Sequence, residues 1–226
     1  SAAANATILA ALGRLPEPGQ ADLEARIDRH VSADVGSTNP ILISSTVEFD
    51  VLDLTGFGLF IADRRLEPYA SADTVVSWQT SADGMYDKVV MRDDLVWSDG
   101  RPITAHDVAF SYVVIMDPRV PVPAVRNGTD QMKGVHAYDD RTVVFFHKEP
   151  LATNVWNINF PVLPRHVYEP TWEQDPTLKD SPAHVKLEQA PVSGGPYEIV
   201  DRKRGQEIRS EEHTSELQSP YVISYA

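Results

Sequence analysis

The stretch between residues 74 and 118 combines two strand-like runs, a turn and a helix signal, and it restricts the fold more than any other part of the sequence. Thr74–Thr80 and Met85–Arg92 are rich in β-branched and aromatic residues and are separated by Ser81-Ala82-Asp83-Gly84. An Asp-Gly pair between two such runs favours a tight reversal. The pattern therefore predicts a β-hairpin over these residues.

A capped helix is predicted directly after the hairpin. Leu95-Val96-Trp97 is typical of a short strand, which Ser98-Asp99-Gly100 turns. Thr104 is then a good N-cap residue, and Asp107, three residues later, can return the capping bond. Asp117-Pro118 ends the helix. The expected buried stripe consists of Val108, Tyr112, Ile115 and Met116.

The remaining elements are less strongly marked, and together they indicate the fold class. We predict helices at residues 21–29 and from Thr46 to about Ala62, with a strand at 30–35 between them. A second hairpin should pair Gly134–Tyr138 with Thr142–Lys148. A polar loop from Pro170 to about Gln189 and a strand at Tyr197–Val200 are expected after it. Hairpins are interspersed with helices, so the class is α+β, with a mixed sheet and flanking helices.

Charge and composition exclude several classes of function. The 226 residues include 33 acidic and 20 basic side chains, a net charge of −13. Nucleic acids and anionic membrane surfaces need clustered Lys and Arg, so neither is an expected partner. The absence of Cys excludes disulfides and thiolate metal sites. No run approaches the roughly 20 apolar residues that span a bilayer.

The motifs of common enzymes are also missing. There is no Gly-x-Ser-x-Gly elbow and no phosphate-binding loop that ends in Lys-Ser/Thr. The histidines have no tight ligand spacing, so surface or capping roles are expected for them and no metal or cofactor is predicted. They are His30, His106, His136, His147, His166 and His184, with a seventh at His213. We predict that the protein is not an enzyme.

Four blocks of sequence resemble the oligopeptide/dipeptide-binding family, the large solute-binding proteins of ABC importers. The strongest runs from Ser77-Trp78 through Ser81–Gly84 to Met91–Tyr112, where a tryptophan strand, a Ser-Asp-Gly turn and a Thr-capped helix follow one another. Thr38-Asn39-Pro40-Ile41 is similar to an early Leu-Asn-Pro loop, with Thr in place of Leu. The later blocks are Leu163–Tyr168 and Pro191–Tyr197, the last departing mildly from Gly-Thr-Gly-Pro-Tyr. The resemblance covers about residues 33–208.

The resemblance implies one periplasmic-binding-protein-like lobe of a two-lobed protein that delivers peptides or similar small solutes to a membrane permease. Residues 1–45 would be the N-terminal helix and first strand of lobe I, 46–165 the middle subdomain, and 166–208 the return to lobe I. Most of the second lobe would be missing. A monomer located in the periplasm or outside the cell is expected, and a membrane anchor could have preceded Ser1.

Residues 209–226 resemble the translation of a short-read sequencing adapter rather than natural protein. The similarity covers Arg209–Pro220 and Ile223–Ala226, and we interpret 209–226 as a non-native tail. On this reading the natural sequence is cut at Ile208, where the return strand for Tyr197–Val200 would begin. That strand is therefore expected to lack its partner.

Four residues are candidates for ligand contact, each with a structural alternative. Thr38 and Asn39 lie where, by resemblance, the chain borders the cleft, but they also suit a plain turn. Arg126 and Asn127 follow the capped helix in a segment that borders the ligand in relatives, and Arg126 could hold a carboxylate with two hydrogen bonds. Surface placement is the alternative. Gly194-Gly195-Pro196 could form an anion nest or a structural turn.

Two other functions stay open at this point. The chain could be a stand-alone interaction module whose acidic surface meets a protein partner. It could also be a hydrolase, which would need paired acids or a Ser/His pair that meet in a pocket. Asn127-Gly128-Thr129 also fits a glycosylation sequon, which would be idle in a bacterium.

Overall fold

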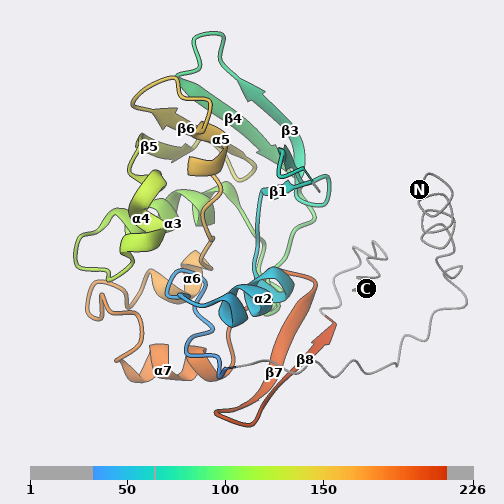
Figure 1. Cartoon of the computed structure of the whole chain (residues 1–226), viewed down its shortest axis with the longest axis vertical. Coiled ribbons are helices and arrows are strands. Elements are labelled where there is room, and N and C mark those ends of the chain that lie inside the picture. Colours follow the sequence, from blue (N-terminus) through green and yellow to red (C-terminus); the bar gives the residue numbers. More distant parts are fainter. Residues whose placement is uncertain (1–32, 64, 213–226) are drawn as a thin grey trace, which may run out of the picture. The chain divides into compact units, whose positions relative to one another are not determined.

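The computed structural model describes residues 33–63 and 65–212. Their helices are α2 (Thr46–Thr55), α3 (Ala105–Met116), α4 (Pro123–Thr129), α5 (Asn154–Asn157), α6 (Arg165–Tyr168) and α7 (Pro182–Gln189) (Figure 1). Their strands are β1 (Phe60–Ala62), β2 (Pro68–Ala70), β3 (Val75–Thr80), β4 (Tyr86–Met91), β5 (Met132–Ala137), β6 (Thr142–His147), β7 (Tyr197–Lys203) and β8 (Glu207–Glu212). The α+β class is confirmed.

A four-stranded sheet in the order β3-β4-β6-β5 is the largest sheet of the described residues. Both hairpins predicted for it are confirmed, β3 pairing with β4 and β5 with β6. Their turns have the expected chemistry: Gly84 has a φ of 67°, and Asp139 accepts hydrogen bonds from the N–H groups of Arg141 and Thr142. All pairings among the described strands are antiparallel, so the expected mixed sheet is wrong.

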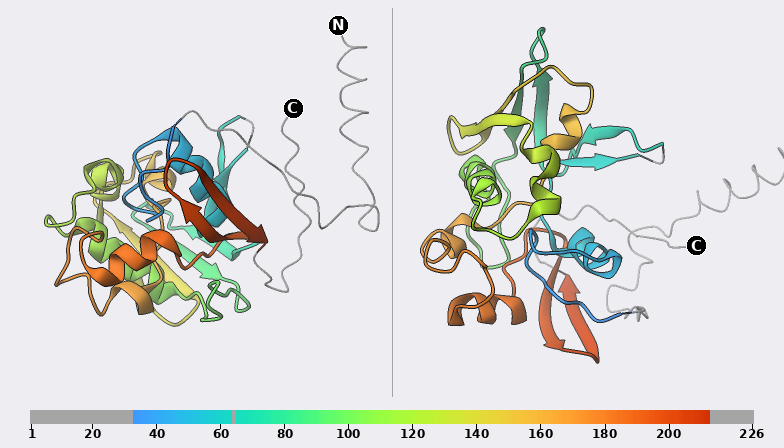
Figure 2. Two further views of the ribbon diagram at one scale, coloured as in Figure 1. Left: turned by 90° about the horizontal axis from the view of Figure 1, so that it is seen from below. Right: turned by 60° about the vertical axis from the view of Figure 1, so that its left-hand side comes forward.

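One face of this sheet carries the core. Val89, Met91, Val143 and Phe145 are fully buried. Helix α3 packs on β5 and β6, as the views in Figure 2 show. Because side chains alternate along a strand, Lys88, Phe146 and His136 lie on the opposite face, which is more exposed. The core thus lies between the sheet and α3.

The predicted cap of α3 is confirmed, but the helix is buried more widely than its stripe suggested. Thr104 and Asp107 form the capping box. Val108 and Ile115 are buried as expected, whereas Tyr112 and Met116 are only half-buried. The segment after α5 covers a second flank of α3. It is attached there by a hydrogen bond from Leu163 N to the Ser111 hydroxyl at 2.8 Å.

Three predicted elements need correction. The helix from Thr46 does not reach Ala62; it ends at Thr55 because Gly56 leaves the helical conformation, and Phe60–Ala62 pairs with β2 instead. The strand at Leu95–Trp97 is reduced to one bridge between Val96 and Pro102. The polar loop 170–189 contains α7, which Ser181 caps and Pro182 begins.

Strand β7 has a partner, contrary to expectation. β8 pairs with it from Tyr197 opposite Glu212 to Lys203 opposite Glu207. The pairing extends β7 past Val200, and it includes residues 209–212, the first part of the segment interpreted as a non-native tail. The predicted helix at 21–29 and the start of the strand at 30–35 lie outside the described residues, and residues 33–35 are not in a strand.

Candidate functional site

The loop with Thr38 and Asn39 is buried and tightly bonded. The backbone N of Thr38 donates to Oε2 of Glu188 at 2.9 Å, and its hydroxyl donates to the Glu188 carbonyl at 3.0 Å. Oδ1 of Asn39 accepts from Ile41 N at 3.2 Å. Nδ2 of Asn39 is buried and has no partner among residues 33–63 and 65–212. Most polar atoms of the loop are therefore engaged inside the chain.

Glu188 is the centre of this network, which we call the Glu188 cluster (Ser37, Thr38, Glu188 and Arg202). Nη1 of Arg202 lies 3.1 Å from Oε2 of Glu188 and also donates to the Glu188 carbonyl at 2.7 Å. Nη2 of Arg202 donates to the carbonyls of Val35 and Gly36. The Arg202 side chain is 1% exposed and that of Glu188 is 10% exposed, so the ion pair is shielded from water.

A second carboxylate holds the same loop from α2. Glu48 accepts from the backbone N of Ser37 at 2.9 Å and completes the capping box with Ser45. Burial alone would raise the pKa of Glu48, but N–H donors from Ser44, Ser37 and Ser45 outweigh it and lower the pKa. The loop at 35–39 is thus fixed by three elements, α2, α7 and β7.

Arg126 closes the C-terminal end of α3 in this structure. Its Nε donates to the carbonyl of Ile115 at 2.8 Å, and its Nη2 donates to those of Asp117 and Val120, both at 2.7 Å. No basic residue lies in the last turn of α3, so Arg126 supplies the positive charge that favours a helix C-terminus. Asn127, the next residue, is exposed.

The two candidate pairs are not brought together by hydrogen bonds. Thr38 and Asn39 bond to α7 and their own loop, whereas Arg126 bonds to the end of α3 and the connection after it. Ligand contact by any of the four residues stays a prediction.

Replacing Arg126 by methionine should lower the free energy of unfolding by about 2 kcal/mol, because three carbonyls lose a charged donor. Urea unfolding of the two proteins measures the difference. Arg119→Met is the matched control, since Arg119 lies in the same connection but is 53% exposed and bonds to Asp117. We expect the control to be almost neutral. Equal effects of the two variants would contradict the role of Arg126 as the cap of α3.

The Gly194-Gly195 pair forms a structural turn, so the anion nest is wrong. The N–H groups of both glycines donate to the carbonyl of Thr55 at 3.0 Å. A nest needs N–H groups that are free to face an anion. These two instead attach the entry of β7 to the end of α2.

Two buried histidines are paired with aspartates. Nε2 of His147 lies 2.6 Å from Oδ2 of Asp87, whose other oxygen accepts from Trp78 and Thr80. Nδ1 of His184 lies 2.7 Å from Oδ2 of Asp175. Burial opposes ionisation of Asp175, yet donors from Thr177, Ser181 and His184 outweigh it and hold its pKa well below the usual range.

Thr171 also bonds to His184 of the second pair. This arrangement of three side chains bears on the hydrolase hypothesis. Nε2 of His184 lies 2.9 Å from the Thr171 hydroxyl, so the order Asp175-His184-Thr171 matches that of a catalytic triad. His184 is fully buried. Neither of the two hollows described below is lined by any of the three residues. The three side chains bond α7 to the segment at residues 171–175.

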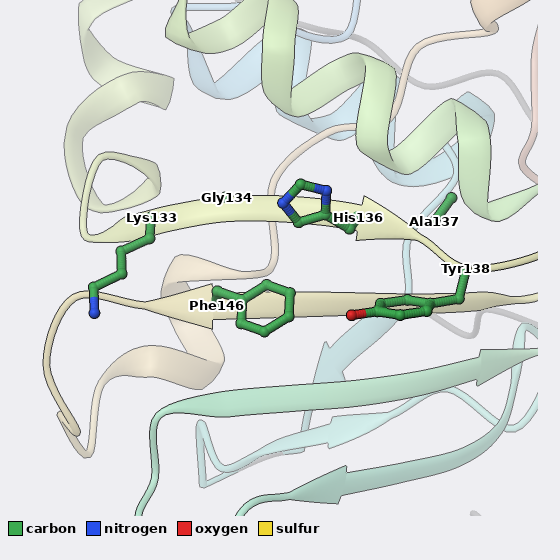
Figure 3. A pocket seen from close by; sticks show the side chains of 6 residues that line it. All are labelled: Lys133, Gly134, His136, Ala137, Tyr138 and Phe146. Atoms are coloured by element: carbon green, nitrogen blue, oxygen red, sulfur yellow. The ribbon is translucent and has the colours of Figure 1, made fainter.

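Two shallow hollows lie on the four-stranded sheet. One, of about 530 Å³, is on the more exposed face of the sheet. The rings of Tyr138 and Phe146 lie over β6 there, next to the ring of His136 on β5 (Figure 3). The other, of about 450 Å³, lies between Trp78, Asp87 and the segment at residues 150–155. None of the four candidate ligand residues lines either hollow.

Within residues 33–63 and 65–212, no three His, Asp or Glu side chains are grouped as metal ligands. No helix in the same ranges is long and apolar enough to cross a bilayer.

Comparison with known proteins relates most of the chain to one family. Residues 71–216 match the middle region of the bacterial extracellular solute-binding proteins, family 5. Protein XP55 of Streptomyces lividans is 31% identical over 126 residues, which are 56% of this chain and 21% of that protein. The probable ABC transporter periplasmic-binding protein SapA of Escherichia coli is 25% identical over 81% of this chain and 36% of its own length.

A solved structure shares the fold of this chain. The Haemophilus influenzae OppA complex with RPPGFSPFR superposes with a TM-score of 0.64 at 23% identity, over 80% of this chain and 37% of that one. The chain thus spans between about a fifth and two fifths of the length of these relatives.

Several central residues of the loop network were not found from the sequence. Ser45 and Glu48 carry the Ser-x-x-Glu signature of a capping box, so this signal was present. Glu188 and Arg202 had no signal, because they are far from residue 38 in the sequence and only the tertiary fold brings them to it.

Proposed function

The chain belongs to the bacterial extracellular solute-binding proteins of family 5, and from this membership we propose that it supplies part of the first lobe of a binding protein that captures peptides or similar small solutes for an ABC importer. The match over residues 71–216 carries the proposal. Two relatives support the proposed role and ligand class. SapA is described as a probable ABC transporter periplasmic-binding protein, and OppA was solved in complex with RPPGFSPFR.

The proposal assigns parts of the chain. Residues 46–165 form the middle subdomain, between an N-terminal part at 1–45 and a return to the first lobe at 166–208. Thr38, Asn39, Arg126 and Asn127 border the ligand. The complete protein is a monomer without catalytic activity, resides in the periplasm or outside the cell and delivers its ligand to a membrane permease.

The stand-alone interaction module is not favoured. The family match covers most of the described residues. The acidic surface, on which the module rested, has no further observation to support it.

Peptide binding should require more of the protein than this chain contains. A ligand stabilises a closed two-lobed state only through contacts made by both lobes, and this chain spans 37% of the peptide-bound OppA chain. We expect negligible heat of binding when di- and oligopeptides, including RPPGFSPFR, are titrated into the 226-residue chain by isothermal calorimetry. The complete protein should bind at least one peptide of the set.

Two outcomes would overturn the proposal. Micromolar binding by the 226-residue chain alone would show that the missing part of the protein is not needed. A complete, folded protein that binds no peptide or related solute would contradict the assignment of the ligand class. Thermal unfolding checks that both preparations are folded before the titrations.

A further inference from the structure

The Asn127-Gly128 dipeptide, besides the ligand contact proposed for Asn127, has the chemistry of a spontaneous modification site. It is the only Asn-Gly pair in the sequence. When an Asn side chain meets the backbone N of the next residue, a five-membered ring can close. A following glycine permits this most readily, because it has no Cβ to obstruct the approach and its backbone rotates freely.

The backbone at this pair is irregular, although it lies within α4. Asn127 has φ −63° and ψ 121°, and Gly128 has φ 94° and ψ −50°, so neither residue is helical. The N–H of Gly128 donates to Oδ1 of Asp130 at 3.2 Å, an acceptor on a side chain instead of a helical carbonyl. Ring closure therefore requires local rotation at Asn127 and loss of this one side-chain bond from Gly128 N.

Asn127 is also accessible, in contrast to most asparagines of the described residues. Its side chain is exposed, whereas Asn39 and Asn154 are buried. Asn39 precedes Pro40, which has no N–H and cannot close the ring. Asn159 is exposed but precedes the bulky Phe160. Only Asn127 combines exposure with a following glycine.

We infer that Asn127 is a site of spontaneous deamidation, with water as the only co-reactant. The backbone N of Gly128 loses its proton and attacks Cγ of Asn127, forming a new C–N bond. The bond from Cγ to Nδ2 breaks, and the nitrogen leaves as ammonia. Water then opens the ring at either carbonyl, giving aspartate or isoaspartate.

The same tripeptide also fits a glycosylation sequon, and the structure distinguishes the two chemistries. Thr129 is 3% exposed, and its hydroxyl donates to the carbonyl of Val125 at 2.7 Å. A modifying enzyme would have to release this buried hydroxyl, whereas ring closure involves only Asn127 and Gly128. Deamidation would place a new negative charge next to Arg126 in the sequence.

The experiment uses the 226-residue chain and an internal control. Folded protein is kept at mildly alkaline pH, below its unfolding temperature, in water labelled with heavy oxygen, and is then digested with trypsin. Cleavage after Arg126 and Lys133 isolates Asn127 in peptide 127–133, and cleavage after Lys148 and Arg165 collects Asn154, Asn157 and Asn159 in peptide 149–165. Mass spectrometry follows both peptides in time.

We expect peptide 127–133 to lose ammonia, gain one labelled oxygen and separate into aspartate and isoaspartate forms. Peptide 149–165 should stay unchanged over the same period. The Asn127→Gln variant, which keeps the amide but enlarges the ring, should abolish the product without altering stability. An unchanged peptide 127–133, equal conversion of both peptides, or a product that persists in Asn127→Gln would each overturn the inference.

Discussion

Replacing Arg202 by methionine should lower the free energy of unfolding by about 3–5 kcal/mol, the cost typical of removing one partner from a buried ion pair. The substitution leaves the Glu188 carboxylate buried without its cation, and it removes the donors to the carbonyls of Val35 and Gly36. Methionine replaces the unbranched stem of the arginine side chain as far as Nε, which limits the loss of packing. Urea unfolding at neutral pH measures the loss.

Two further proteins make this prediction specific. Arg209→Met changes an arginine of the same hairpin that is 68% exposed, and it should leave stability almost unchanged. The double variant Glu188→Gln/Arg202→Met removes the orphaned charge and should be more stable than Arg202→Met alone. A loss below about 1 kcal/mol in Arg202→Met, or a double variant less stable than the single one, would refute the ion pair as the anchor of the loop at 35–39.

The parts of the fold that were predictable from the sequence depend on local chemistry. The Asp-Gly turn before Met85 and the Thr104–Asp107 box each involve residues within a few positions of one another. Their geometry is decided by backbone preferences and short-range hydrogen bonds, so the pattern is sufficient. The hairpins and α3 were therefore confirmed.

Errors arose where distant residues decide the outcome. The pairing of Phe60–Ala62 with β2 withdraws those residues from the helix that their apolar spacing suggested. The apolar stripe of α3 was too narrow, because Leu163 and its neighbours cover a second flank. Neither partner is recognisable from the helix sequence itself, since apolar periodicity reports one buried face and not the number of neighbours.

In the candidate site, too, the sequence indicated residue types but not their tertiary partners. Thr38 and Asn39 were selected from a motif, and the structure shows what the motif cannot, namely that Glu188 and Glu48 bind their loop. The two-pronged donor expected of Arg126 exists, but it meets backbone carbonyls of the chain instead of a free carboxylate. A residue type reveals the bonds it can make, and only the fold determines the partner.

Substituting alanine for Gly195 should destabilise the protein by about 3 kcal/mol, at the upper end of the usual cost of overpacking. A Cβ at this position would lie 2.6 Å from the carbonyl oxygen of Leu54 and 2.8 Å from that of Gly56. These are backbone atoms, so they cannot move aside as the end of a side chain can. Gly195 is required because β7 enters against the end of α2, and not because of a left-handed φ.

Gly58→Ala is the matched control, because a Cβ there meets only the carbonyl of Phe60 at 3.9 Å. Its stability should be unchanged or rise by up to about 1 kcal/mol, since alanine restricts the unfolded chain. Both variants are compared by urea unfolding with the parent chain. If Gly195→Ala were as stable as Gly58→Ala, the close contact between α2 and the entry of β7 would be wrong, and with it the turn assigned to Gly194-Gly195.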